Sequence, residues 1–226
     1  MITSKQPDIK NLITKVREYL PEAKCSQVEQ AFAYAHACHK GQARESGEPY
    51  IGHPFKIAIF LAGLRMDATT LSAALLHDVV EDCGVTYAEL NRRFGPEVTK
   101  LVDGVTKLNR MDLTEQEKSP FIETENRLKA ETLRKMLLAM ADDVRVILIK
   151  LADRFHNMQT LKALPAKRRI AIAKETLETY SPLAHRLGMW DIKWQLEDMS
   201  LSFLEPVQYK EISKMLAARR TEREEF

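Results

Sequence analysis

The chain has 226 residues, of which 45% are hydrophobic, so it can build one sizeable core or one domain with a short appendage. Its 34 basic and 32 acidic residues leave a formal net charge of +2. That balance argues against general binding to DNA or to membrane surfaces, since both need a clear basic excess. Aromatic residues make up only 7%, and glycine and proline are sparse, a composition typical of all-helical domains.

Helix boundaries are marked throughout the first half of the chain. A helix is predicted from about residue 26 to 40, where Gly41 can end it. Later starts are marked by proline or by side chains that can cap a helix, namely Pro54, Asp67, Thr86 with Glu89, and Pro96. The helix that begins after Asp67 carries the strongly apolar run 71–76.

The polar and acidic stretch 111–126, which contains Pro120, interrupts this pattern and predicts a surface loop or a partly ordered lid. In the second half, helical spacing of apolar residues returns at about 127–140, 143–161, 165–180, 190–204 and 206–223. Pro182 predicts a break or kink after the third of these. No alternation typical of strands persists, so the predicted fold class is all-α, with about ten helices.

Four ionisable residues follow the apolar run 71–76, namely His77, Asp78, Glu81 and Asp82. The spacing of His77, Asp78 and Glu81 can place all three on one helix face. A buried charge is costly unless it is neutralised, paired or bound to a metal. A His-Asp dipeptide by itself is more often a hydrogen-bonded core pair, so a functional interpretation needs further residues.

Two other segments supply them. His53 lies in GEPYIGHP, residues 47–54, and Asp153 lies in IKLADRFHNMQTL, residues 149–161, on another apolar helix. With His77 and Asp78 they form a set of two imidazoles and two carboxylates drawn from three helices. The wide spacing excludes a zinc finger. Mixed nitrogen and oxygen ligation with carboxylates suits Mn²⁺ and leaves positions for water and substrate oxygens.

Four segments in this order carry a family resemblance, namely RESGEPYIGHP, ALLHDVVED, VTKL and KLADRFHNMQTL. The order His…His-Asp…Asp resembles that of the HD-domain metal-dependent phosphohydrolases. More narrowly, the segments resemble the hydrolase domain of the Rel/SpoT family of bifunctional alarmone enzymes, from about residue 28 to 215. The resemblance implies an HD-domain helical fold, with the hydrolase domain over residues 1–200. Residues 201–226 would be a helical segment that leads toward a synthetase domain absent from this chain.

The resemblance also implies a reaction, the hydrolysis of the 3′-pyrophosphate of (p)ppGpp to GDP or GTP and pyrophosphate, which ends the stringent-response signal. The metal would be Mn²⁺, with Fe²⁺ and Zn²⁺ as alternatives, held by the two histidines and two aspartates already named. Glu81 and Asp82 match the family's Glu-Asp motif and are the candidates for proton transfer. Glu81 is the preferred one because it can share a face with His77.

Residues in the loop before His53 are candidates for binding the nucleotide. Arg44 can stack on a purine or hold a phosphate, and Ser46 and Tyr50 can form hydrogen bonds. The resemblance implies that this loop holds the guanosine. Glu45 stands where the family usually has a second basic residue, which predicts weaker binding of an anionic nucleotide unless its side chain points outward.

Asn157 and Thr160 are expected to continue the helix face of Asp153, and the family motif assigns them to the sugar and base edge of the nucleotide. His156 is expected to pack or to form a hydrogen bond beside Asp153. Three scattered cysteines, Cys25, Cys38 and Cys83, and the lack of any 18-residue apolar run predict a cytoplasmic protein without a membrane segment.

Two other functions stay open. The domain could be an HD phosphohydrolase that acts on another nucleotide, which a substrate panel would decide. It could also be a non-catalytic regulatory domain with a decayed site. The second is disfavoured because every candidate ligand and proton-transfer residue is present.

Overall fold

The structure is a computed structural model that describes residues 7–115, 134, 136, 138, 140 and 142–224, with side chains described outside 110–115 and 217–224. These residues are mainly helical, and the β pairing found among them is an isolated bridge between Ala43 and Pro49. The all-α prediction is therefore confirmed. The chain divides into two compact units, 1–156 and 157–226. The boundary near residue 200 falls inside the second unit and stays a prediction.

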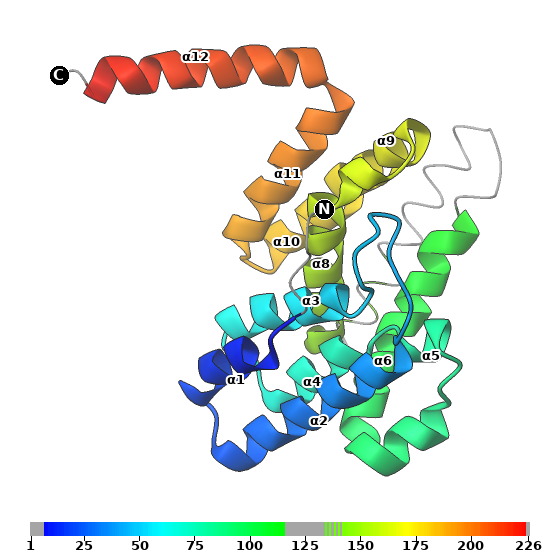
Figure 1. Cartoon of the computed structure of the whole chain (residues 1–226). Coiled ribbons are helices and arrows are strands. Elements are labelled where there is room, and N and C mark those ends of the chain that lie inside the picture. The colour runs from blue at the N-terminus through cyan, green and yellow to red at the C-terminus, as the bar shows by residue number, and fades with distance from the viewer. Residues whose placement is uncertain are drawn as a thin grey trace. The chain divides into compact units, whose positions relative to one another are not determined.

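The first unit is built around an apolar helix, α4, whose residues are all buried except Thr69. This helix contacts α2, α3 and α6 (Figure 1). The helices of the unit are α1 (Ile9–Arg17), α2 (Glu22–Cys38), α3 (Gly52–Gly63), α4 (Ala68–Leu76), α5 (Val79–Asp82), α6 (Tyr87–Glu115) and α8 (Val144–Gln159) up to His156. Because three helices surround α4, the residues that follow its last turn are held in the interior.

Several predicted helix boundaries are confirmed. Asp67 caps α4, since its Oδ1 accepts a hydrogen bond of 3.0 Å from the backbone N–H of Thr70. Thr86 Oγ1 accepts from the backbone N–H of Glu89 at 3.2 Å, as the capping-box spacing predicts. Gly95 has φ +83°, a left-handed conformation that suits glycine, and it kinks α6 directly before the predicted proline start.

The prediction of a loop over 111–126 is wrong for residues 111–115, which are helical. Helix α6 continues through Glu115, because Met111, Leu113 and Glu115 are good helix formers that extend a helix already begun. Polarity alone did not distinguish a loop from a helix there, since both can be polar. The rest of the predicted loop, 116–126, lies outside the described residues.

The second unit packs α11 against α9, α10 and the π-helical turn between them. Its elements after the end of α8 are η1 (Leu161–Ala163), α9 (Ala166–Glu175), η2 (Thr176–Tyr180), α10 (Ser181–Arg186), α11 (Trp190–Leu204) and α12 (Pro206–Glu224). The break predicted at Pro182 takes the form of this π turn. Pro182 has no N–H to donate to the carbonyl of Glu178, and the wider turn accommodates that loss.

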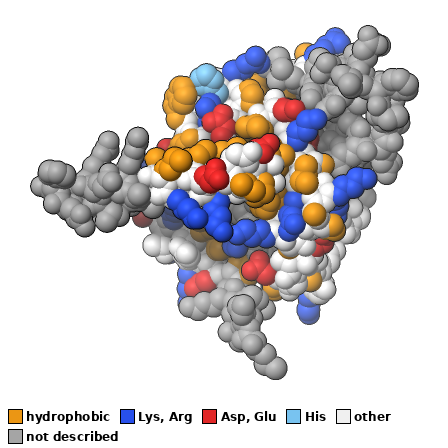
Figure 2. Space-filling model, turned by 90° about the horizontal axis from the view of Figure 1, so that it is seen from above, with side chains coloured by type: hydrophobic (Ala, Val, Ile, Leu, Met, Phe, Trp, Pro, Cys, Tyr) orange, Lys and Arg blue, Asp and Glu red, His pale blue; other side chains and the backbone are white. Residues whose placement is uncertain are grey.

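The surface shows no strong segregation of charge on the face seen in Figure 2, where acidic, basic and hydrophobic side chains are mixed. This agrees with the near balance of charged residues. Among the helices that the structure describes, none is long and apolar enough to cross a membrane.

Candidate metal centre

His77 and Asp78 lie at a break between two helices. Helix α4 ends at Leu76 and α5 begins at Val79, so the single helix face predicted for His77, Asp78 and Glu81 is interrupted. The neighbours Leu76 and Val79 are fully buried, which anchors the turn on both sides. His77 and Asp78 are consequently only 1% and 8% exposed.

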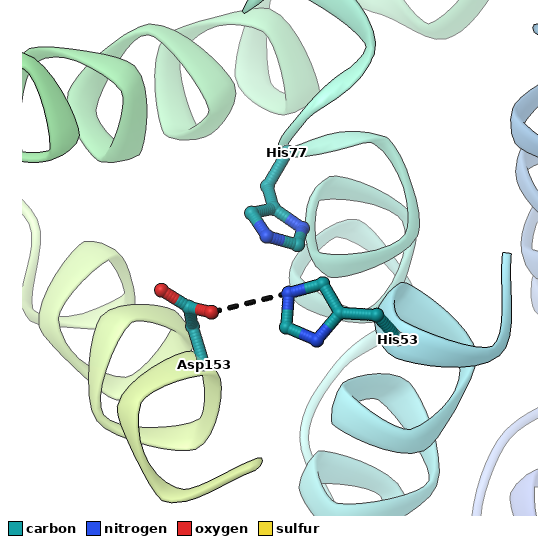
Figure 3. Close-up of side chains that lie close together, drawn as sticks. All are labelled: His53, His77 and Asp153. Carbon is teal, nitrogen blue, oxygen red and sulfur yellow. Dashed lines mark ion pairs between the residues drawn. The ribbon is translucent and has the colours of Figure 1, made fainter. Parts of the chain in front are cut away.

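His53, His77 and Asp153 come together from α3, the end of α4, and α8 (Figure 3). Their candidate ligand atoms all lie within 4.8 Å of one another, and all three residues are buried. His53 Nε2 is 3.2 Å from Asp153 Oδ1. Metal bonds to histidine nitrogen and carboxylate oxygen are about 2.0–2.2 Å long, so the spacing suits atoms arranged around one ion.

Asp78 lies beside both histidines. Its Oδ1 is 3.1 Å from His77 Nε2, and its Oδ2 is 3.8 Å from His53 Nε2. The hydroxyl of Tyr50 donates a hydrogen bond of 2.7 Å to the same Oδ2. The structure therefore gathers all four residues of the predicted ligand set, and it places Tyr50 against one of them.

The surroundings of the two ring nitrogens of His77 indicate whether the site suits a metal ion. Nδ1 is 2.8 Å from the carbonyl of Ala74, and a carbonyl only accepts, so the proton lies on Nδ1 in the neutral ring. Nε2 is buried without a hydrogen-bond partner among the described residues, although Asp78 Oδ1 approaches it at 3.1 Å outside hydrogen-bond geometry. Coordination of a metal ion would satisfy it, so the donor set fits a divalent cation.

The two carboxylates of the cluster are held in their charged form. Burial raises the pKa of Asp153, but Lys150 and His53 outweigh it and keep the pKa well below its usual value. Burial likewise raises the pKa of Asp78, and the attraction of His77 and His53 brings it below the ordinary range. For His77, burial lowers the pKa, yet Asp78 outweighs burial and raises it to about 9. A proton and a metal ion thus compete for the same buried nitrogen.

Glu81 and Asp82 differ in their surroundings. Glu81 is half-buried, and its Oε2 accepts a hydrogen bond of 2.9 Å from Asn109 Nδ2. Asn109 Oδ1 in turn accepts from Lys150 Nζ at 2.7 Å. Asp82 is exposed, and its backbone carbonyl accepts from Gln42 Nε2 at 3.2 Å. Hydrogen bonds through Asn109 and Lys150 connect Glu81 to the cluster, whereas Asp82 lies close to Tyr50, which bonds to Asp78.

In the loop before α3, Arg44 faces the cluster, as Tyr50 does. Arg44 Nη1 lies 3.1 Å from His53 Nδ1 and 3.1 Å from His156 Nδ1. Gly47, with φ +82°, closes the loop by donating its N–H to the carbonyl of Arg44 at 2.8 Å. Ser46 and Glu45 are both exposed. Weaker binding of an anionic nucleotide was expected unless the Glu45 side chain points outward, and its exposure meets that condition.

Asn157 and Thr160 belong to the second unit. Asn157 lies on α8 four residues after Asp153, but α8 ends at Gln159, one residue short of the continuous face predicted to include Thr160. Thr160 folds back instead, and its N–H and its hydroxyl both donate to the carbonyl of Asn157, at 3.2 and 3.3 Å.

The sequence pattern did not identify Lys150 and Asn109 as partners of the cluster, and His156 was expected only to pack or to form a hydrogen bond beside Asp153. Lys150 and His156 lie three residues before and after Asp153, a spacing that places them on its helix face and could have identified them. Asn109 gave no such signal, because a polar residue after VTKL is also expected on an ordinary exposed helix face.

Comparison with known proteins supports the predicted resemblance. The family model for the HD domain matches residues 31–190. The bifunctional (p)ppGpp synthase/hydrolase SpoT of Escherichia coli K12 is 46% identical over 211 residues, which cover 93% of this chain and 29% of that protein. The guanosine-3′,5′-bis(diphosphate) 3′-pyrophosphohydrolase of Vibrio cholerae is 47% identical over 210 residues, covering 93% and 28%.

A solved structure extends the comparison to three dimensions. It belongs to a metazoan ortholog of SpoT that is described as hydrolysing ppGpp and having a role in starvation responses. The TM-score is 0.54 at 26% sequence identity, and the match covers 80% of this chain and 95% of that one. The chain spans between a quarter and three tenths of the length of the curated relatives it matches.

Proposed function

Since this chain belongs to the HD domain family, we propose that it is a metal-dependent hydrolase that removes the 3′-pyrophosphate from (p)ppGpp. One observation carries the proposal. His53, His77, Asp78 and Asp153 gather in a chain that is 46–47% identical to proteins named for this reaction. The products would be GDP or GTP and pyrophosphate, which ends the alarmone signal in the cytoplasm.

The four gathered side chains would hold the metal, and Mn²⁺ is the ion we propose. A set of two imidazoles and two carboxylates suits Mn²⁺, whereas structural Zn²⁺ sites are usually closed and rich in thiolates. When bound, the ion would neutralise phosphate charge and make a water molecule more acidic. The chain's own contribution is to keep both aspartates ionised and to aim Nε2 of His77 into the cluster.

Glu81 and Asp82, which follow the proposed ligands His77 and Asp78 in the chain, are the groups that we propose for proton transfer. In the reaction, a water oxygen bonds to the phosphorus that carries O3′, the P–O3′ bond breaks, and O3′ leaves with a proton. Glu81 is the proposed group that takes the proton from the water, because hydrogen bonds hold it beside the cluster. Asp82 is exposed and is proposed as the second carboxylate of the pair.

Nucleotide binding is proposed for the loop around Arg44 and for Asn157 and Thr160. Arg44 is a guanidinium close to His53, where it could meet a phosphate oxygen or the face of a purine. Ser46 is exposed and available to a ligand, whereas Tyr50 is engaged with Asp78. We further propose that residues 201–226 lead toward a synthetase domain, as the bifunctional relative suggests.

The test is pyrophosphate release from ppGpp by the purified chain, without metal and with added Mn²⁺. Release that depends on Mn²⁺ and is lost in Asp78→Ala would support the function, with Asp142→Ala at an exposed position as the matched control. A panel of other nucleoside 3′- and 5′-phosphates would be assayed in parallel. Hydrolysis of one of these in place of ppGpp would contradict the proposed substrate and support the other HD phosphohydrolase activity.

A further inference from the structure

A line of hydrogen bonds joins Glu81 to Asp153 through two side chains that have no assigned role. Asn109 on α6 donates from Nδ2 to Glu81 Oε2 at 2.9 Å, and its Oδ1 accepts from Lys150 Nζ at 2.7 Å. Lys150 on α8 also lies 3.3 Å from Asp153 Oδ2. The line therefore connects α5, α6 and α8, and it runs from the proposed proton acceptor to a proposed metal ligand.

We propose that Asn109 is a positioning residue that orients Glu81 for proton transfer, and that Lys150 fixes the orientation of the Asn109 amide. This inference rests on the proposed hydrolysis of ppGpp. An ammonium group only donates hydrogen bonds, so Lys150 must face the oxygen of the amide. The nitrogen of the amide is then directed at Glu81, and a flipped amide would lose both contacts.

Lys150 can do this because it is itself held rigidly. It is only 5% exposed, as is Asp153, so its long side chain does not move freely in solvent. A buried ammonium is costly without partners, and here one carboxylate and one amide oxygen supply them. The buried ion pair therefore fixes the orientation of the Asn109 amide. Through its hydrogen bond, the amide restricts the orientation of the Glu81 carboxylate.

A fixed orientation of the Glu81 carboxylate matters for proton transfer. General acid–base catalysis requires the proton acceptor to lie within hydrogen-bond reach of the reacting group, and the carboxylate of a glutamate has three rotatable bonds that can misplace it. A hydrogen bond to Oε2 from a fixed amide restricts those bonds.

Asn109→Leu removes both polar contacts and keeps the branching and the number of heavy atoms of the side chain. We expect kcat for ppGpp hydrolysis to fall about 10- to 100-fold, a part of the 10²–10⁴ that acid–base catalysis supplies. KM for ppGpp should stay within about twofold of its original value. Mn²⁺ affinity, measured by calorimetry, should do the same, because Asn109 does not contact the proposed metal ligands. Asn109→Gln keeps both polar groups and should recover part of kcat. Asn91→Leu, at an exposed position of the same helix, is the control.

A double-mutant cycle separates positioning from a general structural effect. In a Glu81→Gln background, Asn109→Leu should cause little further loss, because the group it orients no longer accepts a proton. Independent, multiplicative losses would overturn the proposal. So would an Asn109→Leu variant with unchanged kcat, or one whose kcat falls only together with its melting temperature and Mn²⁺ affinity.

Lys150→Met gives a contrasting result, since Lys150 also contacts Asp153. It should lower both kcat and Mn²⁺ affinity, whereas Asn109→Leu lowers kcat alone. Failure of this inference differs from failure of the proposed function. If the unaltered chain hydrolyses ppGpp and the variants do not show this pattern, only the positioning role is overturned. If the unaltered chain binds Mn²⁺ but leaves ppGpp intact, the proposed function fails and the positioning role fails with it.

Discussion

The Nδ1 atoms of His53 and His156 lie 2.8 Å apart inside the protein, and the Arg44 guanidinium lies 3.1 Å from each. At that distance one nitrogen donates and the other accepts. We propose that His53 binds the metal through Nε2, which leaves its proton on Nδ1 and makes His53 the donor and His156 the acceptor. Burial, together with the nearby His53 and the positive charge of Arg44, lowers the pKa of His156 to about 3, which keeps it neutral.

The first prediction concerns this acceptor. His156→Phe keeps an aromatic ring but leaves His53 Nδ1 without its partner imidazole, so Mn²⁺ affinity should fall about 10- to 100-fold. Titration calorimetry of the metal-free protein measures this directly. His36→Phe replaces an exposed histidine and should leave the affinity unchanged. Equal affinity in His156→Phe and the unaltered chain would mean that the imidazole pair does not orient the ligand.

Tyr50 carries the second prediction, because two roles are open to it. Its hydroxyl donates to Asp78 Oδ2, and its ring stacks on His39 with centroids 4.6 Å apart. Tyr50→Phe keeps the stacking and removes the hydrogen bond, so Mn²⁺ affinity should fall about tenfold. Tyr34→Phe is the control, since that hydroxyl donates to a different carboxylate, Glu89. A higher KM for ppGpp with unchanged Mn²⁺ affinity would support direct nucleotide contact instead.

A third prediction follows from the raised pKa of His77, about 9 in the metal-free protein. Between its ordinary value near 6.5 and 9, the folded protein binds more protons than the unfolded chain. This contribution to stability is full below pH 6.5 and is lost as pH rises through 9. Mn²⁺ must displace the same proton, so at pH 7.5 binding should release about one proton. Calorimetry in buffers of different ionisation enthalpy counts it, and a count of zero would contradict the prediction.

The residues of the proposed metal centre could be predicted to lie together because several of them break an apolar pattern. His77 and Asp78 end a buried helix, and Asp153 lies within another, so each polar group needs a partner in the interior. The identity of those partners was less accessible. Whether the Tyr50 hydroxyl meets a nucleotide or Asp78 depends on how α3 and α4 approach each other, and the chemistry of a phenol suits both.

Local rules also reached a limit at helix ends. The spacing of His77 and Glu81 suits one helix face, yet the chain turns at His77 and Asp78. Thr160 likewise falls just beyond the end of α8 and bonds back to Asn157. Helix ends vary by one or two residues with tertiary packing, which periodicity does not report. Local spacing gave no information on Asn109, since its partners are 28 and 41 residues away in the chain.

The final prediction tests how α6 approaches α8. A Cβ on Gly104 would lie 2.8 Å from Val146 Cγ2, closer than side chains tolerate. Valine is stiff at χ1 in a helix, so the clash should cost about 1–3 kcal/mol, which exceeds the roughly 0.5–1 kcal/mol gained from replacing a helical glycine by alanine. Gly104→Ala should therefore lower the free energy of unfolding, measured by urea denaturation.

Two matched variants decide whether close approach is the cause. Gly63→Ala meets only the flexible end of Lys15, at 3.2 Å from Nζ, and should be neutral or stabilising. Adding Val146→Ala to Gly104→Ala should relieve the clash, so the pair should lose less than the sum of the two single changes. Additive losses would show that Gly104 is not required for this contact. Because α6 carries Asn109 and α8 carries Lys150, Gly104→Ala should also lengthen the bond between them and reduce kcat.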